Sequence, residues 1–117
     1  MRNLALASVA LALAAGCGSV PKPEARIASS EGSIRGAREA GAQSVPQASL
    51  YLKLAEEERS KAMALVRSGD YERANYLLMR AEADAELANA LAREKAAKQE
   101  VEQASERVEK IKGGGTP

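Results

Sequence analysis

The chain of 117 residues contains no histidine, tryptophan or phenylalanine, and only one cysteine. Without imidazole it lacks the side chain that most often transfers protons near neutral pH and most often binds transition metals. Aromatic residues make up 3% of the chain, and the scarcity of aromatic and β-branched side chains argues against a β-sheet protein. Because alanine is the commonest apolar residue, we predict an all-α protein whose thin core consists of close helix contacts.

The chain also lacks an excess of either charge. Lys and Arg number 17 against 16 Asp and Glu, for a net charge of +1. Proteins that bind nucleic acid usually gather basic residues on one face, whereas the signs alternate along this chain. We therefore expect no nucleic-acid partner.

What is present at the N-terminus is a leader. Met1 to Asn3 carries one positive charge, and Leu4 to Ala15 is an apolar run. A membrane-spanning helix needs about 20 apolar residues, so this shorter run is typical of a secretory signal peptide. We predict a signal peptide over residues 1–16, with cleavage between Gly16 and Cys17.

The segment Ala14-Ala15-Gly16-Cys17 resembles the lipobox of bacterial lipoproteins, with Ala14 where the pattern prefers leucine. The resemblance implies that Cys17 becomes the first mature residue and carries acyl chains such as palmitate. Several chains anchor a protein durably where one does not. Gly18 follows, and by the same resemblance it points to the outer membrane, with the mature chain facing the periplasm. The alternative is an ordinary secretory peptide followed by a chance cysteine.

After Cys17 we expect a short Pro-containing tether over residues 17–23 and then a first helix from Glu24 to Ala40. Gly32 and Gly36 weaken this helix, since each glycine costs about 1 kcal/mol relative to alanine, so we expect it to form only when docked. Their GxxxG spacing suggests dimerisation in a lipid-embedded helix. Close packing against a neighbouring helix is the favoured interpretation here.

Gly41 predicts the end of the first helix, and the segment from Ser44 to Gln47 resembles a capping box that starts a second helix running to Ser68. We expect its core face to be formed by Tyr51, Leu54, Ala55, Ala62, Leu65 and Val66. Gly69 and Asp70 predict a tight turn into a third helix.

From Tyr71 to Lys112 there is no proline or glycine. This predicts one helix about 60 Å long, against about 35 Å for the second helix. The third helix should therefore overhang by roughly 25–30 Å, with residues 113–117 as a flexible tail. We expect Tyr51, Tyr71 and Tyr76 to be partly buried, and the packed face of the third helix to contain Leu77, Leu78, Ala81, Ala85, Leu87, Ala88 and Leu91.

The overhang carries a narrow apolar stripe, which we call the seam, whose spacing alternates between four and three residues: Ala97, Val101, Ala104, Val108 and Ile111. This spacing is typical of a coiled coil. The seam covers only about two heptads, so a solvated single helix is the alternative. As a partner-binding surface, the seam would contact an envelope protein or a second copy of the chain.

Several segments resemble a family of short, Ala-rich helical bacterial lipoproteins, domain of unknown function 4398: Ala40-Gly41-Ala42 with Pro46, "GDYERA" at residues 69–74, and "AEADAELANALA" at residues 81–92. The resemblance covers about residues 25–97 and implies a role in the cell envelope without a mechanism. "GDYERANYLLMRAEA" also resembles half of a tetratricopeptide-type hairpin. The predicted fold is thus an antiparallel helical hairpin or three-helix arrangement over residues 24–112, with a protruding C-terminal helix.

No constellation in the sequence indicates catalysis. Glu82 and Glu86 share a helix face, but a solvated surface explains them better than a carboxylate pair. We expect no catalytic residue, cofactor or metal. The chain ends in Thr-Pro, without the terminal lysine by which murein lipoprotein is joined to the wall. The expected function is a lipid-anchored adaptor or scaffold, with a periplasmic holdase-like chaperone or an envelope spacer as alternatives.

Overall fold

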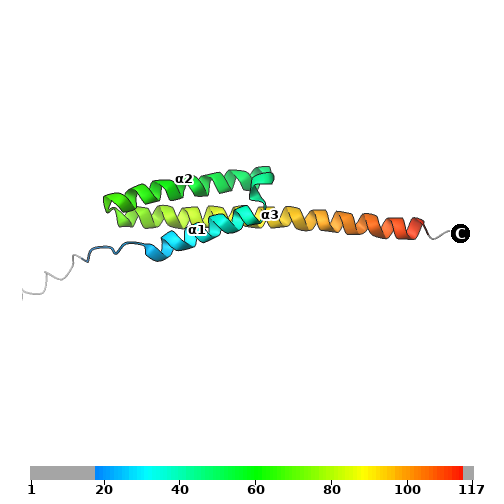
Figure 1. Cartoon of the computed structure of the whole chain (residues 1–117), viewed down its shortest axis with the longest axis horizontal. Helices are drawn as coiled ribbons and strands as arrows, with labels where there is room; N and C mark the ends of the chain where they lie inside the picture. The colour runs from blue at the N-terminus through cyan, green and yellow to red at the C-terminus, as the bar shows by residue number, and fades with distance from the viewer. Residues whose placement is uncertain (1–17, 115–117) are drawn as a thin grey trace, which may run out of the picture.

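The computed structural model describes residues 18–114, which form three α-helices and one short 3-10 turn. The elements are α1 (Glu24–Glu39), η1 (Ala42–Ser44), α2 (Pro46–Ser68) and α3 (Tyr71–Gly113). Figure 1 shows that α1 and α2 lie along the first half of α3, while the second half of α3 projects beyond them. The prediction of an all-α fold with a long, protruding C-terminal helix is confirmed.

The helices run up, down and up, because both connections reverse the chain within a few residues. Gly41 and Gly69 occupy the left-handed region, with φ of 83° and 81°, where glycine meets no steric penalty. The Asp70 side chain accepts a hydrogen bond from the Arg73 backbone N–H at 3.3 Å, which caps α3. The predicted ends of the helices were therefore right to within one residue.

The start of α2 differs from the prediction of a capping box. Val45 is the N-cap residue and makes no side-chain cap, and Pro46 opens the helix. Ser44 instead belongs to η1, where its hydroxyl donates to the Gly41 carbonyl at 2.8 Å. Proline has no backbone N–H and therefore leaves no donor without an acceptor at the first helical position.

The core is formed mostly by alanine, with a few larger residues from each helix. α3 buries residues at alternating intervals of four and three: Ala74, Leu78, Ala81, Ala85, Ala88 and Ala92. Against them pack the buried residues Ile34 and Ala37 of α1 and Ala48, Leu52, Ala55, Ala62 and Val66 of α2. Methyl-sized side chains at these positions let the helix backbones approach closely.

Three expectations about larger side chains were wrong. Leu54 of α2 is 38% exposed, Leu87 of α3 is 41% exposed, and Tyr76 is 60% exposed. All three point away from the core, and alanines take the buried positions. Tyr51 and Tyr71 are partly buried, as expected.

The first helix docks on the bundle, mainly against α3. A Cβ atom added at Gly36 would lie 3.2 Å from the Asn89 side chain of α3, whereas one at Gly32 would meet nothing within 4 Å. Close packing therefore explains the second glycine of the GxxxG spacing and not the first. Ser30 is fully buried in the same helix and donates to the Ile27 carbonyl at 3.1 Å.

Candidate interaction surface

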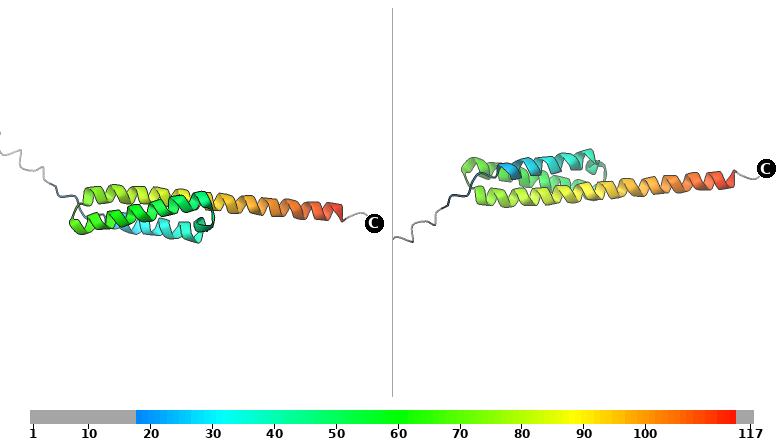
Figure 2. Two further views of the ribbon diagram at one scale, coloured as in Figure 1. Left: turned by 90° about the horizontal axis from the view of Figure 1, so that it is seen from above. Right: turned by 90° about the horizontal axis from the view of Figure 1, so that it is seen from below.

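The two ends of the molecule differ in what they present. Residues 18–23 are extended and lie at the end of the bundle where α2 turns into α3 (Figures 1 and 2), and Ser19 and Val20 share a shallow hollow with Gly69 and Tyr71. The predicted lipidation residue Cys17 and cleavage residue Gly16 lie outside the described residues. The described chain thus enters the bundle at the end opposite the projecting half of α3.

No residue in the projecting half of α3 is buried. Every residue from Arg93 to Gly114 is exposed, and this segment is about 30 Å long at 1.5 Å per residue. All five seam residues lie on it, and the larger ones, Val101, Val108 and Ile111, are 69%, 48% and 76% exposed. The predicted overhang exists, and its apolar stripe is uncovered.

Charged residues flank the beginning of the seam. Glu94 and Lys98, one helical turn apart, form an ion pair beside Ala97 and Val101. This contact lowers the pKa of Glu94 and raises that of Lys98, in each case chiefly through their hydrogen bond. Both side chains are highly exposed, so the pair shapes the charge of the surface more than it stabilises the helix.

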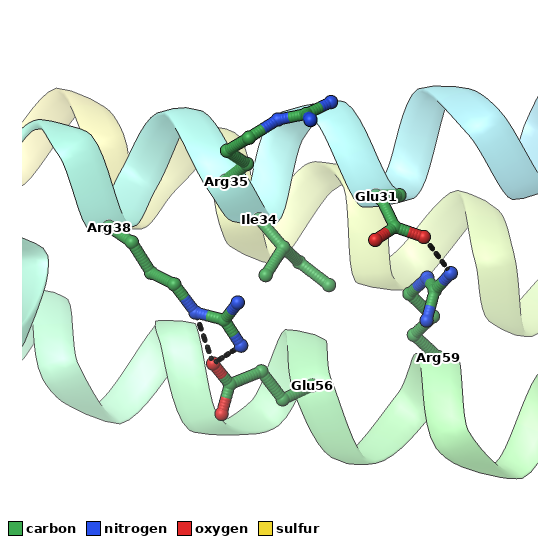
Figure 3. A pocket seen from close by; sticks show the side chains of 6 residues that line it. All are labelled: Glu31, Ile34, Arg35, Arg38, Glu56 and Arg59. Atoms are coloured by element: carbon green, nitrogen blue, oxygen red, sulfur yellow. Dashed lines mark hydrogen bonds and ion pairs between the residues drawn. The ribbon is translucent and has the colours of Figure 1, made fainter.

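Ion pairs connect α1 and α2 along a groove on the bundle. Arg38 donates to Glu56 through Nε at 3.0 Å and Nη2 at 2.6 Å, and Arg59 pairs with Glu31. Figure 3 shows both pairs bridging the two helices over Ile34, with Arg35 directed away from them. The carboxylates thus pair with Arg38 and Arg59, and these two ion pairs connect α1 to α2 across the groove.

A buried acid is the polar feature that sequence reasoning missed. Glu58 of α2 is only 6% exposed; its Oε1 lies 2.6 Å from Nη2 of Arg80, and its Oε2 has no hydrogen-bond partner among the described residues. Burial raises the pKa of Glu58, Arg80 opposes this effect, and nearby Asp84 adds to it. The spacing of residues in the sequence could have indicated this burial, because Glu58 lies between Ala55 and Ala62 on the buried face of α2.

The carboxylates considered in the sequence do not form a pair. Glu82 turns to α1, where it accepts from Arg26 at 3.0 Å and from the Ser29 hydroxyl, and these partners lower its pKa, Ser29 most of all. Glu86 remains exposed. Glu82 of α3 therefore forms a polar contact with α1 that helps to hold the two helices together.

Within residues 18–114, no cluster of acidic and sulfur ligands could hold a metal ion. None of the helices there has a stretch of sufficient length and hydropathy to span a bilayer.

Comparison with protein families gives one match. The model of the family described as Domain of unknown function (DUF4398) matches residues 25–104, which is more than half of the chain. The chain belongs to the DUF4398 family. Neither the curated proteins nor the solved structures include a significant match.

The DUF4398 match covers α1, α2 and most of α3 and ends inside the overhang. Ala97, Val101 and Ala104 fall within the match, and Val108 and Ile111 lie beyond it. The family region thus contains the whole bundle together with the first part of the seam.

Proposed function

We propose that this DUF4398 protein is a lipid-anchored, non-enzymatic adaptor or scaffold of the bacterial outer membrane that faces the periplasm. The observation that carries the proposal is the exposed seam on a segment about 30 Å long, at the opposite end of the molecule from residues 18–23. An anchor at Cys17 would place the bundle near the membrane and direct the overhang of a single chain away from it. Such an arrangement suits presentation of a helix to another protein.

The anchor is tested by replacing Cys17 with serine. We expect the wild-type chain to incorporate a labelled fatty acid and to fractionate with membranes, and Cys17→Ser to lose both properties. A Gly18→Asp variant keeps the cysteine and, by resemblance to other lipoproteins, is expected to move from the outer to the inner membrane. Incorporation of label that persists in Cys17→Ser would contradict anchoring at this residue.

The adaptor role is tested by photo-crosslinking in cells that make the intact protein. A photoreactive residue at Val101, Ala104 or Val108 is expected to give a discrete adduct. The matched control carries the photoreactive residue in place of Gln99, which is exposed on the side of the overhang opposite the seam. Ala97→Glu, which places a charge in the seam, should reduce adducts at Val101.

The outcomes separate the candidate functions. A discrete adduct confined to the seam supports an adaptor or scaffold. A broad smear of adducts, together with suppressed aggregation of unfolded clients by the purified protein, would instead indicate a holdase. The absence of adducts at every seam position would leave the overhang as a spacer and contradict the adaptor proposal.

A further inference from the structure

The seam does not end at the edge of the bundle. Toward the N-terminus of α3, exposed residues continue the seam at intervals of seven residues. The full series is Tyr76, Ala83, Ala90, Ala97, Ala104 and Ile111. Three positions between them are also apolar and exposed, namely Leu87, Val101 and Val108. These nine residues form an extended seam over about five heptads, long enough for a coiled coil.

The extended seam lies on the side of α3 that the other helices leave bare. Each of Ala83 and Ala90 is two residues from a buried alanine, Ala85 or Ala88, and two residues on an α-helix point about 160° apart. In both views of Figure 2, α3 lies at one edge of the bundle, with α1 and α2 to one side of it. A further helix can therefore approach along α3 from Tyr76 to Ile111.

We propose that a second copy of this chain covers the extended seam, so that two α3 helices pair in antiparallel orientation. The inference deepens the proposed function, on which it rests, by naming the partner of the same surface. Residues within the extended seam face each other in this pairing when their numbers sum to 191, and the flanking residues that directly precede Leu87, Glu94, Val101 and Val108 meet when their numbers sum to 193. Three of the larger residues then meet an alanine of the second copy: Leu87 meets Ala104, Val101 meets Ala90, and Val108 meets Ala83, whereas Ile111 meets Arg80.

The charges beside the extended seam select this pairing. Its flanking positions at intervals of seven are Glu86, Arg93, Glu100 and Arg107, all exposed and none in an ion pair within residues 18–114. In the proposed register, Glu86 meets Arg107 and Arg93 meets Glu100 of the second copy, so all four contacts are attractive. Because the sign alternates, a shift by one heptad brings like charges together. Flanking charges of this kind set the partner and orientation of coiled coils.

A parallel, in-register pair is less favourable. It would bring Arg93 close to Lys98 and Arg107 close to Lys112 of the other copy, which are like charges at positions that normally carry opposite ones. It would also place Glu94 against Glu94 in the seam. In the antiparallel pair Glu94 meets Ala97, with Lys98 of the second copy nearby.

The antiparallel pair has a consequence for orientation. It places the two N-terminal ends of α3 about 70 Å apart at 1.5 Å per residue, at opposite ends of a rod. Two copies anchored in one membrane would therefore lie along its surface, in contrast to the single chain, whose overhang points away.

The test uses the full-length chain with Cys17→Ser, which removes the only native cysteine and needs no lipid anchor. One tagged chain carries Ala90→Cys and a second, with another tag, carries Val101→Cys. Under mild oxidation we expect the mixture to form a disulfide-linked heterodimer. The control Gln99→Cys, on the opposite side of the overhang, should not link to Ala90→Cys. Val101→Cys linked to itself would indicate parallel pairing and overturn the proposal.

A charge exchange tests the register independently of the cysteine positions. Glu100→Arg in both chains replaces two attractive contacts with Arg–Arg contacts and should lower the cross-linking yield about tenfold. Arg93→Glu in both chains should have the same effect. Glu100→Arg in one chain with Arg93→Glu in the other restores every contact, so the yield should recover. No recovery in this mixture would overturn the proposed register.

Failure of self-pairing is distinguishable from failure of the proposed function. A heterologous adduct at Val101 in cells, without the disulfide between positions 90 and 101, would retain the adaptor and reject a second copy as its partner. If neither product formed, both would be rejected.

Discussion

At the scale of single residues, the surroundings of two acidic side chains in the bundle shift their pKa values in opposite directions. Glu82 is stabilised as a carboxylate, because Ser29 and Arg26 both donate to it and lower its pKa. Glu58 is destabilised as a carboxylate, because burial raises its pKa more than Arg80 lowers it. The two acids therefore contribute pH dependences of opposite sign to the free energy of unfolding.

Glu58→Gln tests the cost of the buried charge. A carboxyl whose pKa is higher in the folded than in the unfolded state makes folding less favourable as pH rises through the folded pKa. Above that pH the wild type carries the cost and the amide does not, so we expect the variant to be the more stable protein at pH 7. As pH falls through the raised pKa of folded Glu58 toward the ordinary glutamate range, Glu58 takes up a proton and the advantage should disappear.

Thermal unfolding of both proteins between pH 4 and pH 8 measures this difference, and comparison at each pH cancels the opposite effect of Glu82. A variant less stable than the wild type at pH 7 would show that the Arg80 ion pair outweighs the burial of Glu58.

At the scale of helices, the two glycines of α1 provide a matched pair. Gly32→Ala adds a methyl group into open space and should stabilise the protein by about 0.5–1 kcal/mol through helix propensity. Gly36→Ala places its Cβ 3.2 Å from the Asn89 side chain, which must move, so its gain should be smaller or absent. Denaturant midpoints measure the order; an equal gain at both positions would show that α1 does not pack closely on α3.

The two inter-helix connections provide a second pair. Asp70→Ala removes the hydrogen bond to the Arg73 backbone N–H and should destabilise the protein by about 1 kcal/mol. Ser44→Ala removes only a hydroxyl that donates to the Gly41 carbonyl in an exposed turn, so its effect should lie within about 0.5 kcal/mol. Chemical denaturation of both variants tests this difference. A larger loss for Ser44→Ala would indicate that η1 directs the chain into α2.

The bounds of the helices could be predicted from the sequence, whereas the direction of individual side chains could not. Gly41, Pro46, Gly69 and Asp70 act locally, through φ preferences and caps, so their meaning does not depend on the rest of the fold. α3, however, has two apolar stripes with the same alternating spacing, one led by Ala85 and Ala88 and one by Leu87 and Ala90. Local spacing cannot tell which stripe meets α1 and α2, so the predicted face included Leu87 of the exposed stripe together with Ala85 and Ala88 of the buried one.

The same limit applies to the candidate surface. The overhang followed from helix lengths alone, and the five seam residues are exposed because they lie on it. The extension to Tyr76 required the fold, because only the docking of α1 and α2 on one side of α3 reveals that the other side is bare. Burial of Glu58 likewise depends on which face of α2 meets α3.

At the scale of the whole molecule, the structure divides into a bundle and an overhang that can be separated. Residues 93–114 are exposed throughout, so a chain that ends at Arg93 keeps every residue of the buried core. At low micromolar concentration we expect its unfolding to remain cooperative, with stability within about 0.5 kcal/mol of the full chain. Its helix signal in circular dichroism should fall in proportion to the helical residues removed.

Concentration then separates packing within one chain from pairing between chains. Association stabilises the folded state by mass action, so the thermal midpoint of the full-length chain should rise with protein concentration, and that of the chain ending at Arg93 should not. A marked loss of stability on truncation, already present at the lowest concentration and independent of it, would mean that the overhang folds back onto its own bundle. A concentration dependence that survives truncation would place the self-association on another surface, because the truncated α3 retains only the part of the extended seam from Tyr76 to Ala90.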